Sequence, residues 1–187
     1  MFIQTEETPN PATLKFIPGC EVMVSGTADF KNVDDSARSP LAHRLFEVEG
    51  VDGVFLGLDF ITVAKREDRE WYLMKPAILG VIMEHFTAGR PVISDDVEVD
   101  EGDFNEEDGE VVSQIKELLE TRVRPAVAMD GGDIVFEGFH EGVVTLHMQG
   151  ACAGCPSSTA TLKMGIENML RHYIPEVREV RASNPAF

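Results

Sequence analysis

The feature that most constrains the fold is an acidic run in the middle of the chain. Residues 95–109 hold nine of the 33 acidic side chains and no lysine or arginine, so they carry −9 of the formal net charge of −17. Like charges at this density repel one another and cannot line a common core. We therefore expect two small domains, residues 1–93 and 110–187, joined by an acidic linker at 94–109. A calcium site in this run is disfavoured because the EF-hand spacing is absent, and an acidic docking site is the less favoured alternative to a solvated tether.

The first domain has the pattern of a mixed α/β unit. Alternating apolar residues predict strands, Ser39-Pro40 opens a helical pattern as a cap and first residue, and Gly89 closes a second helix. In chain order, we expect strands at 13–17 and 22–24, a helix from Pro40, a hairpin of 50–56 and 60–64, and a helix that begins at Trp71 or Pro76. The apolar face of this last helix comprises Leu73, Ala77, Ile78, Val81, Ile82, His85 and Phe86.

The second domain begins with an apolar stripe that runs from Val111 to Val123 at helical spacing, and Pro125 is expected to bend or end that helix. The turn Asp130-Gly131-Gly132-Asp133 follows, with glycines where positive φ is expected. A hairpin of 134–139 and 143–148, a helix from Pro156 and an edge strand near 177–180 complete the pattern. The predicted fold class is α/β (α+β): two small domains, each a small mixed β-sheet packed against helices.

Composition excludes several classes of function. No window approaches the roughly 20 apolar residues that a membrane span requires, and the N-terminus does not resemble a signal or transit peptide. The acidic balance offers no basic face for nucleic acid. Three cysteines, an odd number, favour a reducing compartment. We expect a cytoplasmic protein of a bacterium, or one in the mitochondrial matrix if a presequence has been removed.

The chemistry of the chain is concentrated in Gly150-Ala151-Cys152-Ala153-Gly154-Cys155-Pro156. Two cysteines three residues apart lie between a predicted strand and the start of a predicted helix. Helix N-termini stabilise anionic sulfur, and the thiolate is the form that binds metal or attacks a disulfide. The small neighbouring residues leave room for a bulky cluster and leave backbone N–H groups to donate to sulfur. We therefore expect a short, exposed loop with Cys152 and Cys155 as ligands of a metal or cluster.

Three other interpretations of this loop stay open at the level of residues. Cys152 and Cys155 could be buried structural cysteines. They could form the dithiol of a thioredoxin-like oxidoreductase, although too few residues follow Cys155 to build that fold. They could also bridge two chains through a four-cysteine zinc site. A tetrahedral thiolate site needs four ligands, and Cys20 lies in the other domain. If cysteines alone bind the metal, a second copy of the chain supplies the missing pair.

The motifs of both domains resemble those of one family. Residues 110–180 resemble the C-terminal domain of NifU and of Nfu-type iron–sulfur scaffold and carrier proteins. That match is carried by Arg124-Pro125, Met129–Asp133, Gly150–Ser158 and the helix from Thr159 to Met169. Residues 1–90 resemble the N-terminal domain of Nfu proteins through Glu7–Pro11, Leu14–Phe16, Phe60–Val63 and Trp71.

The resemblance implies a scaffold or carrier, not an enzyme. It would bind a [4Fe-4S] cluster between two chains through Cys152 and Cys155 and transfer it to apo iron–sulfur proteins, after receiving it from upstream assembly proteins. The N-terminal domain is then expected to bind partners. Cys20 is expected to be structural or incidental, and His140 and His147 are expected to be packed or solvated side chains.

Overall fold

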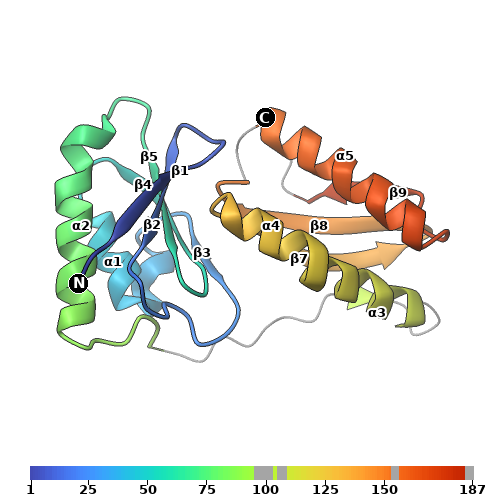
Figure 1. The fold of residues 1–187 in the computed structure, drawn as a ribbon, viewed down its shortest axis with the longest axis horizontal. Coiled ribbons are helices and arrows are strands. Elements are labelled where there is room, and N and C mark those ends of the chain that lie inside the picture. The colour runs from blue at the N-terminus through green and yellow to red at the C-terminus, as the bar shows by residue number, and fades with distance from the viewer. Residues whose placement is uncertain (95–102, 105–108, 153–155, 184–187) are drawn as a thin grey trace. The chain divides into compact units, whose positions relative to one another are not determined.

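The computed structural model describes residues 1–94, 103–104, 109–152 and 156–183 (Figure 1). The chain divides into two compact units, residues 1–99 and 100–187, which are described separately. Each unit packs helices against a sheet, which confirms the predicted fold class. The predicted bounds of the linker stay a prediction, because most of residues 94–109 lie outside the described residues. In the described parts of the chain, no helix combines the length and apolar character needed to cross a membrane.

The N-terminal unit is a five-stranded antiparallel sheet in the order β1-β2-β5-β4-β3, with two helices packed against it. Its core combines one face of the sheet with the buried faces of the helices. In chain order, the elements are β1 (Gln4–Glu7), β2 (Thr13–Ile17), β3 (Ala28–Phe30), a 3₁₀ turn (Asp35–Arg38), α1 (Pro40–Phe46), β4 (Val51–Leu56), β5 (Ile61–Lys65) and α2 (Trp71–Thr87).

Local sequence signals predict most elements of this unit correctly. Ser39 caps α1 as predicted, since its Oγ accepts a hydrogen bond of 3.1 Å from the backbone N–H of Ala42. The predicted hairpin forms as β4 and β5. The helix α2 begins at Trp71 rather than at Pro76, because the backbone N–H groups of Leu73 and Met74 both bond to the carbonyl of Glu70.

Two predictions for this unit were wrong. Residues 22–24 form no strand, because the N–H groups of Val22 and Met23 both donate to the carbonyl of Leu58 and leave no ladder to extend. The third strand is Ala28–Phe30 instead. In α2 the buried face contains Met74, whereas Leu73 and Ala77, which were both expected there, are exposed. The buried positions of α2 are Met74, Ile78, Ile82 and His85.

The C-terminal unit is a four-stranded sheet in the order β6-β7-β8-β9. The central pair β7 and β8 is antiparallel, while β6 and β9 run parallel to their neighbours. The elements are β6 (Asp103–Phe104), α3 (Gly109–Leu118), a π-helical turn (Leu119–Val123), α4 (Arg124–Met129), β7 (Gly132–His140), β8 (Val143–Gly150), α5 (Pro156–Tyr173) and β9 (Glu179–Ala182). The strand β6 lies inside the acidic run, so that run is not a free tether over its whole length.

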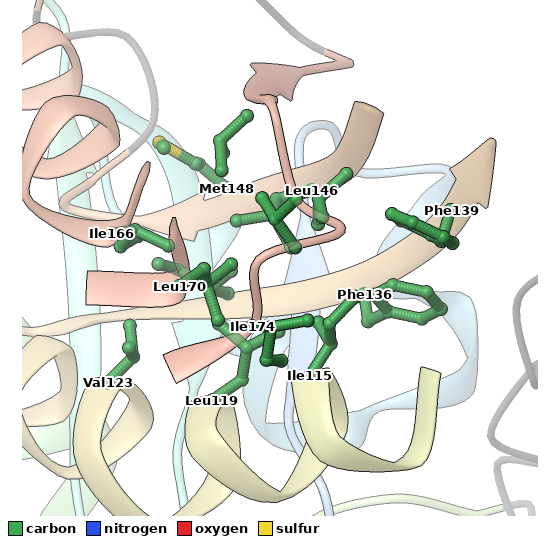
Figure 2. Packing of buried hydrophobic residues seen from close by; sticks show 14 of the residues in the cluster. Ile115, Leu119, Val123, Phe136, Phe139, Leu146, Met148, Ile166, Leu170 and Ile174 are labelled. Carbon is green, nitrogen blue, oxygen red and sulfur yellow. The ribbon is translucent and has the colours of Figure 1, made fainter. Parts of the chain in front are cut away.

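The core of this unit lies between its helices and the β7–β8 hairpin (Figure 2). The side chains of β8 alternate, so that Val144, Leu146 and Met148 are buried. The first helical segment adds Ile115, Leu119 and Val123, and α5 adds Ile166 and Leu170, as predicted from the apolar spacing. These contacts pack one face of the hairpin into the core of the unit.

Pro125 interrupts the first helical segment in a different way from the one predicted. The hydrogen-bonding pattern changes just before it, where the N–H of Arg124 bonds to the carbonyl of Leu119, five residues back. Helical structure then continues as α4 to Met129. A π-helical turn absorbs an extra residue, and such turns occur frequently at functional sites. Arg124 is the residue that directly follows this one.

Candidate cluster-binding site

The first cysteine of the motif lies directly after the central hairpin. β8 ends at Gly150, Ala151 and Cys152 follow in a turn, and α5 begins at Pro156. Cys152 belongs to the core cluster of the C-terminal unit and is only 6% exposed. Cys155, the second predicted ligand, lies outside the described residues. Cys152 and its surroundings are therefore the part of the site that the structure describes.

The sequence predicts an exposed loop, and this prediction is wrong at Cys152 because a tertiary contact buries the segment. The backbone N–H of Ala151 donates to the carbonyl of Gly131 at 3.1 Å. This bond draws the cysteine segment against the turn that precedes β7. Ala151 is accordingly 2% exposed.

Glycine is required at the ends of both central strands, for two different reasons. Gly131 and Gly150 have φ values of +79° and +63°, in the region that glycine adopts freely. Gly132, which pairs with Gly150, does not have positive φ. A Cβ atom at Gly132 would lie 2.5 Å from Sγ of Cys152 and 2.8 Å from the carbonyl oxygen of Gln149. The thiol of Cys152 thus occupies the space that a side chain at residue 132 would fill.

A buried ion pair holds the other side of this turn. Nε of Arg124 donates to Oδ1 of Asp133 and a terminal nitrogen donates to Oδ2, both at 2.9 Å. The side chain of Asp133 is 4% exposed, whereas that of Arg124 is 30% exposed. The hydrogen bonds that Arg124 donates to Asp133 raise the pKa of Arg124 above its ordinary value, so the guanidinium stays charged. A second terminal nitrogen of Arg124 donates to the exposed carboxylate of Glu120 at 2.6 Å.

Sequence reasoning gave Arg124 and Asp133 no role at the site. Both residues fall within the motifs that carry the family resemblance, but their pairing joins positions nine residues apart on different elements. No periodic pattern predicts such a contact. The local signal is an acidic residue at the second position of a strand, directly after two glycines, where most strand residues would be apolar.

The remaining candidate residues lie elsewhere. Cys20 is exposed and belongs to the N-terminal unit. Nδ1 of His147 lies 3.1 Å from Oγ of Ser183, and His140 is exposed beside a shallow pocket formed with Glu141, Glu176 and Arg178. Over the described ranges, no three histidine, cysteine or acidic side chains gather in a geometry that could hold a metal ion.

The chemistry of the site follows from its soft donor. A thiolate sulfur binds zinc, copper(I) and iron–sulfur clusters in preference to hard cations such as calcium or magnesium. The helix α5 begins four residues after Cys152, and backbone N–H groups at a helix start favour negative charge. The residues present therefore fit an iron–sulfur cluster as well as they fit zinc.

Two family models match the chain, one in each unit. Residues 3–89 match the scaffold protein Nfu/NifU N-terminal family, and residues 115–181 match the NifU-like domain family. These ranges leave the acidic run between them. Both parts of the chain therefore match families defined on Nfu or NifU proteins.

Named relatives share nearly the whole chain. The mitochondrial NFU1 iron–sulfur cluster scaffold homolog of Drosophila sechellia is 55% identical over 181 residues, which is 96% of this chain and 64% of that protein. The protein of the same name from Homo sapiens is 53% identical over 181 residues, which is 96% of this chain and 71% of that protein. The chain thus spans about two thirds of the length of these relatives.

Among solved structures, the NMR structure of a NifU-like protein from Saccharomyces cerevisiae is 30% identical. The match covers 51% of this chain and 86% of the yeast chain, with a TM-score of 0.46. The family assignment rests on the sequence matches alone. The matched family is one of scaffold proteins, so the dithiol oxidoreductase interpretation is not supported. The chain belongs to the Nfu family of iron–sulfur cluster scaffold proteins.

Proposed function

We propose that this chain binds a [4Fe-4S] cluster between two copies of itself, through Cys152 and Cys155 of each copy, and transfers it to apo iron–sulfur proteins. The cluster is cargo in this proposal. The relatives support the scaffold role, since they are named iron–sulfur cluster scaffolds. The sharing of the cluster is our inference from the ligand count, and the cluster type is what the resemblance to Nfu-type proteins implies.

The observation that carries the proposal is the shortage of ligands in one chain. Cys152 brings one thiol to the end of β8, and no cluster of three potential metal ligands surrounds it within the described structure. The sequence holds only three cysteines, and Cys20 is in the other unit. A four-iron cluster usually takes four cysteine thiolates. Two copies of the Cys152–Cys155 motif supply that number.

Transfer would proceed by ligand exchange. The thiolates of an apo-protein would replace those of Cys152 and Cys155 on the irons, and each displaced sulfur would remain on this chain as a thiolate or take up a proton. No bond within the protein is formed or broken. We infer that the proteins upstream and downstream of this chain carry or accept the same cluster. We place it in a reducing compartment, the bacterial cytoplasm or the mitochondrial matrix; the names of the relatives, which contain the word mitochondrial, favour the matrix.

Anaerobic reconstitution tests this proposal. Wild-type protein incubated with iron and sulfide should show the absorption and Mössbauer spectra of a [4Fe-4S] cluster. Cys152→Ala or Cys155→Ala should abolish stable binding, because each chain then keeps one motif thiolate. The matched control is Cys20→Ala, which should bind as wild type does. A wild-type protein that takes up zinc but no iron–sulfur cluster would contradict the proposal and favour a structural zinc bridge.

A further inference from the structure

The segment that contains Cys152 is tied to α4 through one turn. The carbonyl of Gly131 accepts from Ala151, and Gly132 leaves the space that Sγ of Cys152 fills. The next residue, Asp133, is held on both carboxylate oxygens by Arg124. Three consecutive residues therefore connect α4 to the cysteine.

The register of the sheet extends this connection. Asp133 pairs with Gln149 of β8, and Gly132 pairs with Gly150. Because Cys152 follows Gln149 by three residues, whatever fixes Asp133 also fixes the strand end from which Cys152 emerges. A shift of β7 at Asp133 would move Gly132 away from the thiol and weaken the bond between Gly131 and Ala151. The position of Asp133 is thus coupled to the burial of Cys152.

The two acidic partners of Arg124 differ in burial, and we assign the anchoring of the turn to the buried one, Asp133. Asp133 is buried, so the loss of the two hydrogen bonds from Arg124 would remove stabilisation from a carboxylate in a region of low dielectric, where such bonds contribute most. Glu120 is 66% exposed, and exposed ion pairs of this kind contribute little to stability. Arg124 is therefore an anchor for the turn through Asp133, and its bond to Glu120 is incidental.

We propose that Arg124 and Asp133 are positioning residues that hold the segment of Cys152 against the turn: in the chain without cluster they keep the thiol shielded, and in the chain with cluster they slow the loss of the cluster. Neither residue touches the cluster in this proposal; both act through the turn 130–133. The role in cluster retention rests on the proposed function, whereas the role in shielding the thiol does not. The two parts can be tested separately.

The first test measures the thiol in the full-length chain without cluster. In a Cys20→Ser, Cys155→Ser background, Cys152 is the only thiol, and its rate of alkylation by iodoacetamide reports how often the turn opens. Asp133→Asn keeps the shape of the side chain but removes its charge. It should raise the alkylation rate about tenfold or more, as expected for the loss of a charge-assisted hydrogen bond. The matched control is Glu120→Gln, which removes the exposed partner of the same arginine and should change the rate less than about twofold.

The second test measures cluster release in chains that keep all three cysteines. A chelator should remove the cluster from Asp133→Asn about tenfold faster than from wild type. Arg124→Lys keeps the charge but loses the two-pronged geometry, so it should release at an intermediate rate. Glu120→Gln should release as wild type does.

The results of these tests distinguish the proposed function from the positioning role. A wild-type chain that binds no cluster overturns the proposed function, and the alkylation assay still decides the positioning role. Wild-type alkylation and release rates in Asp133→Asn overturn the positioning role. A lower unfolding midpoint with unchanged alkylation would mean that the pair only stabilises the fold, and would also overturn it. If far-UV circular dichroism shows Asp133→Asn to be unfolded, the same two rates in Arg124→Lys decide.

Discussion

At the scale of single residues, the described part of the site depends on the absence of a side chain at Gly132. The position has ordinary negative φ, so backbone strain plays no part in its requirement for glycine. Space alone excludes a Cβ atom there, because the sulfur of Cys152 and the carbonyl of Gln149 already occupy it. This makes Gly132 a direct probe of how the thiol packs.

Alanine substitutions at two glycines should change the free energy of unfolding of the C-terminal unit in opposite directions. Gly132→Ala should destabilise the C-terminal unit by about 1–3 kcal/mol, since overpacking forces the neighbours apart, and it should expose Cys152. Gly165→Ala on α5, where a Cβ would meet no atom within 4 Å, should stabilise the unit by about 0.5–1 kcal/mol through helix propensity. Amide hydrogen exchange of β7 and β8 measures both. Equal protection in Gly132→Ala and wild type would contradict the proposed packing.

A second residue-scale prediction concerns His85 in the N-terminal unit, which is fully buried on α2. Burial lowers its pKa, and the positive charges of Arg44 and Arg90 lower it further. The folded state then binds this proton less readily than the unfolded state, whose histidine titrates near about 6.5. The stability that neutral His85 contributes is therefore fully present above that pH. It is lost as the pH falls below it, by at most about 1.4 kcal/mol per pH unit.

The fluorescence of Trp71, the single tryptophan of the chain, reports on this unit during urea unfolding. Between pH 7.5 and 5.5 the wild type should lose more stability than His85→Leu, which cannot take up the proton. The exposed His43 provides the control, since His43→Gln should follow the wild type. Parallel pH curves for His85→Leu and wild type would show that burial of His85 does not govern the pH dependence.

At the scale of elements, the edge strand β6 yields a prediction. It adds two residues parallel to Gly138 and Phe139 at the border of the sheet. A fragment of residues 110–187 lacks β6 but keeps β7, β8, β9 and all the helices of the unit, so it should fold and bind the cluster as a fragment of residues 100–187 does. Far-UV circular dichroism and reconstitution of both fragments measure this. An unfolded shorter fragment beside a folded longer one would show that β6 is essential.

The elements that the sequence predicts well are those with local causes. The stripe of Ile115, Leu119 and Val123 has helical period, the β7–β8 hairpin closes at Glu141 and Gly142 with the positive φ values that such turns need, and Ser39 caps α1. Short strands such as β3 and β6 carry too little pattern to be found. Pro125 signalled an interruption, but its form, a π-helical turn followed by α4, depends on packing against the sheet.

The sequence predicts the sulfur donors of the site but not the contacts that surround them. The spacing of Cys152 and Cys155 indicates a thiolate site directly from the sequence. The burial of Cys152 results from the contact of Ala151 with Gly131, and the anchoring of the turn results from the pair of Arg124 and Asp133. Both contacts join segments that are separate in sequence, and neither leaves a periodic trace. Glycine at position 132 was predicted from conformation, whereas the structure requires it for space.

At the scale of the whole molecule, the chain divides into two units. The C-terminal unit holds Cys152 directly after the β7–β8 hairpin, and the N-terminal unit supplies no described cluster of metal ligands. The family models match each unit separately. We propose that the N-terminal unit binds partners, as expected for a carrier that must meet both a donor and an acceptor of its cargo.

The proposed function requires that two chains share one cluster. This sharing is measured by iron content and mass together, on the same anaerobic sample. Analytical ultracentrifugation of the reconstituted chain should give a dimer with about two irons per chain, because four irons are shared by two copies. Removal of the cluster by a chelator should return the protein towards the monomer. A cluster-loaded monomer with about four irons per chain would contradict the shared site.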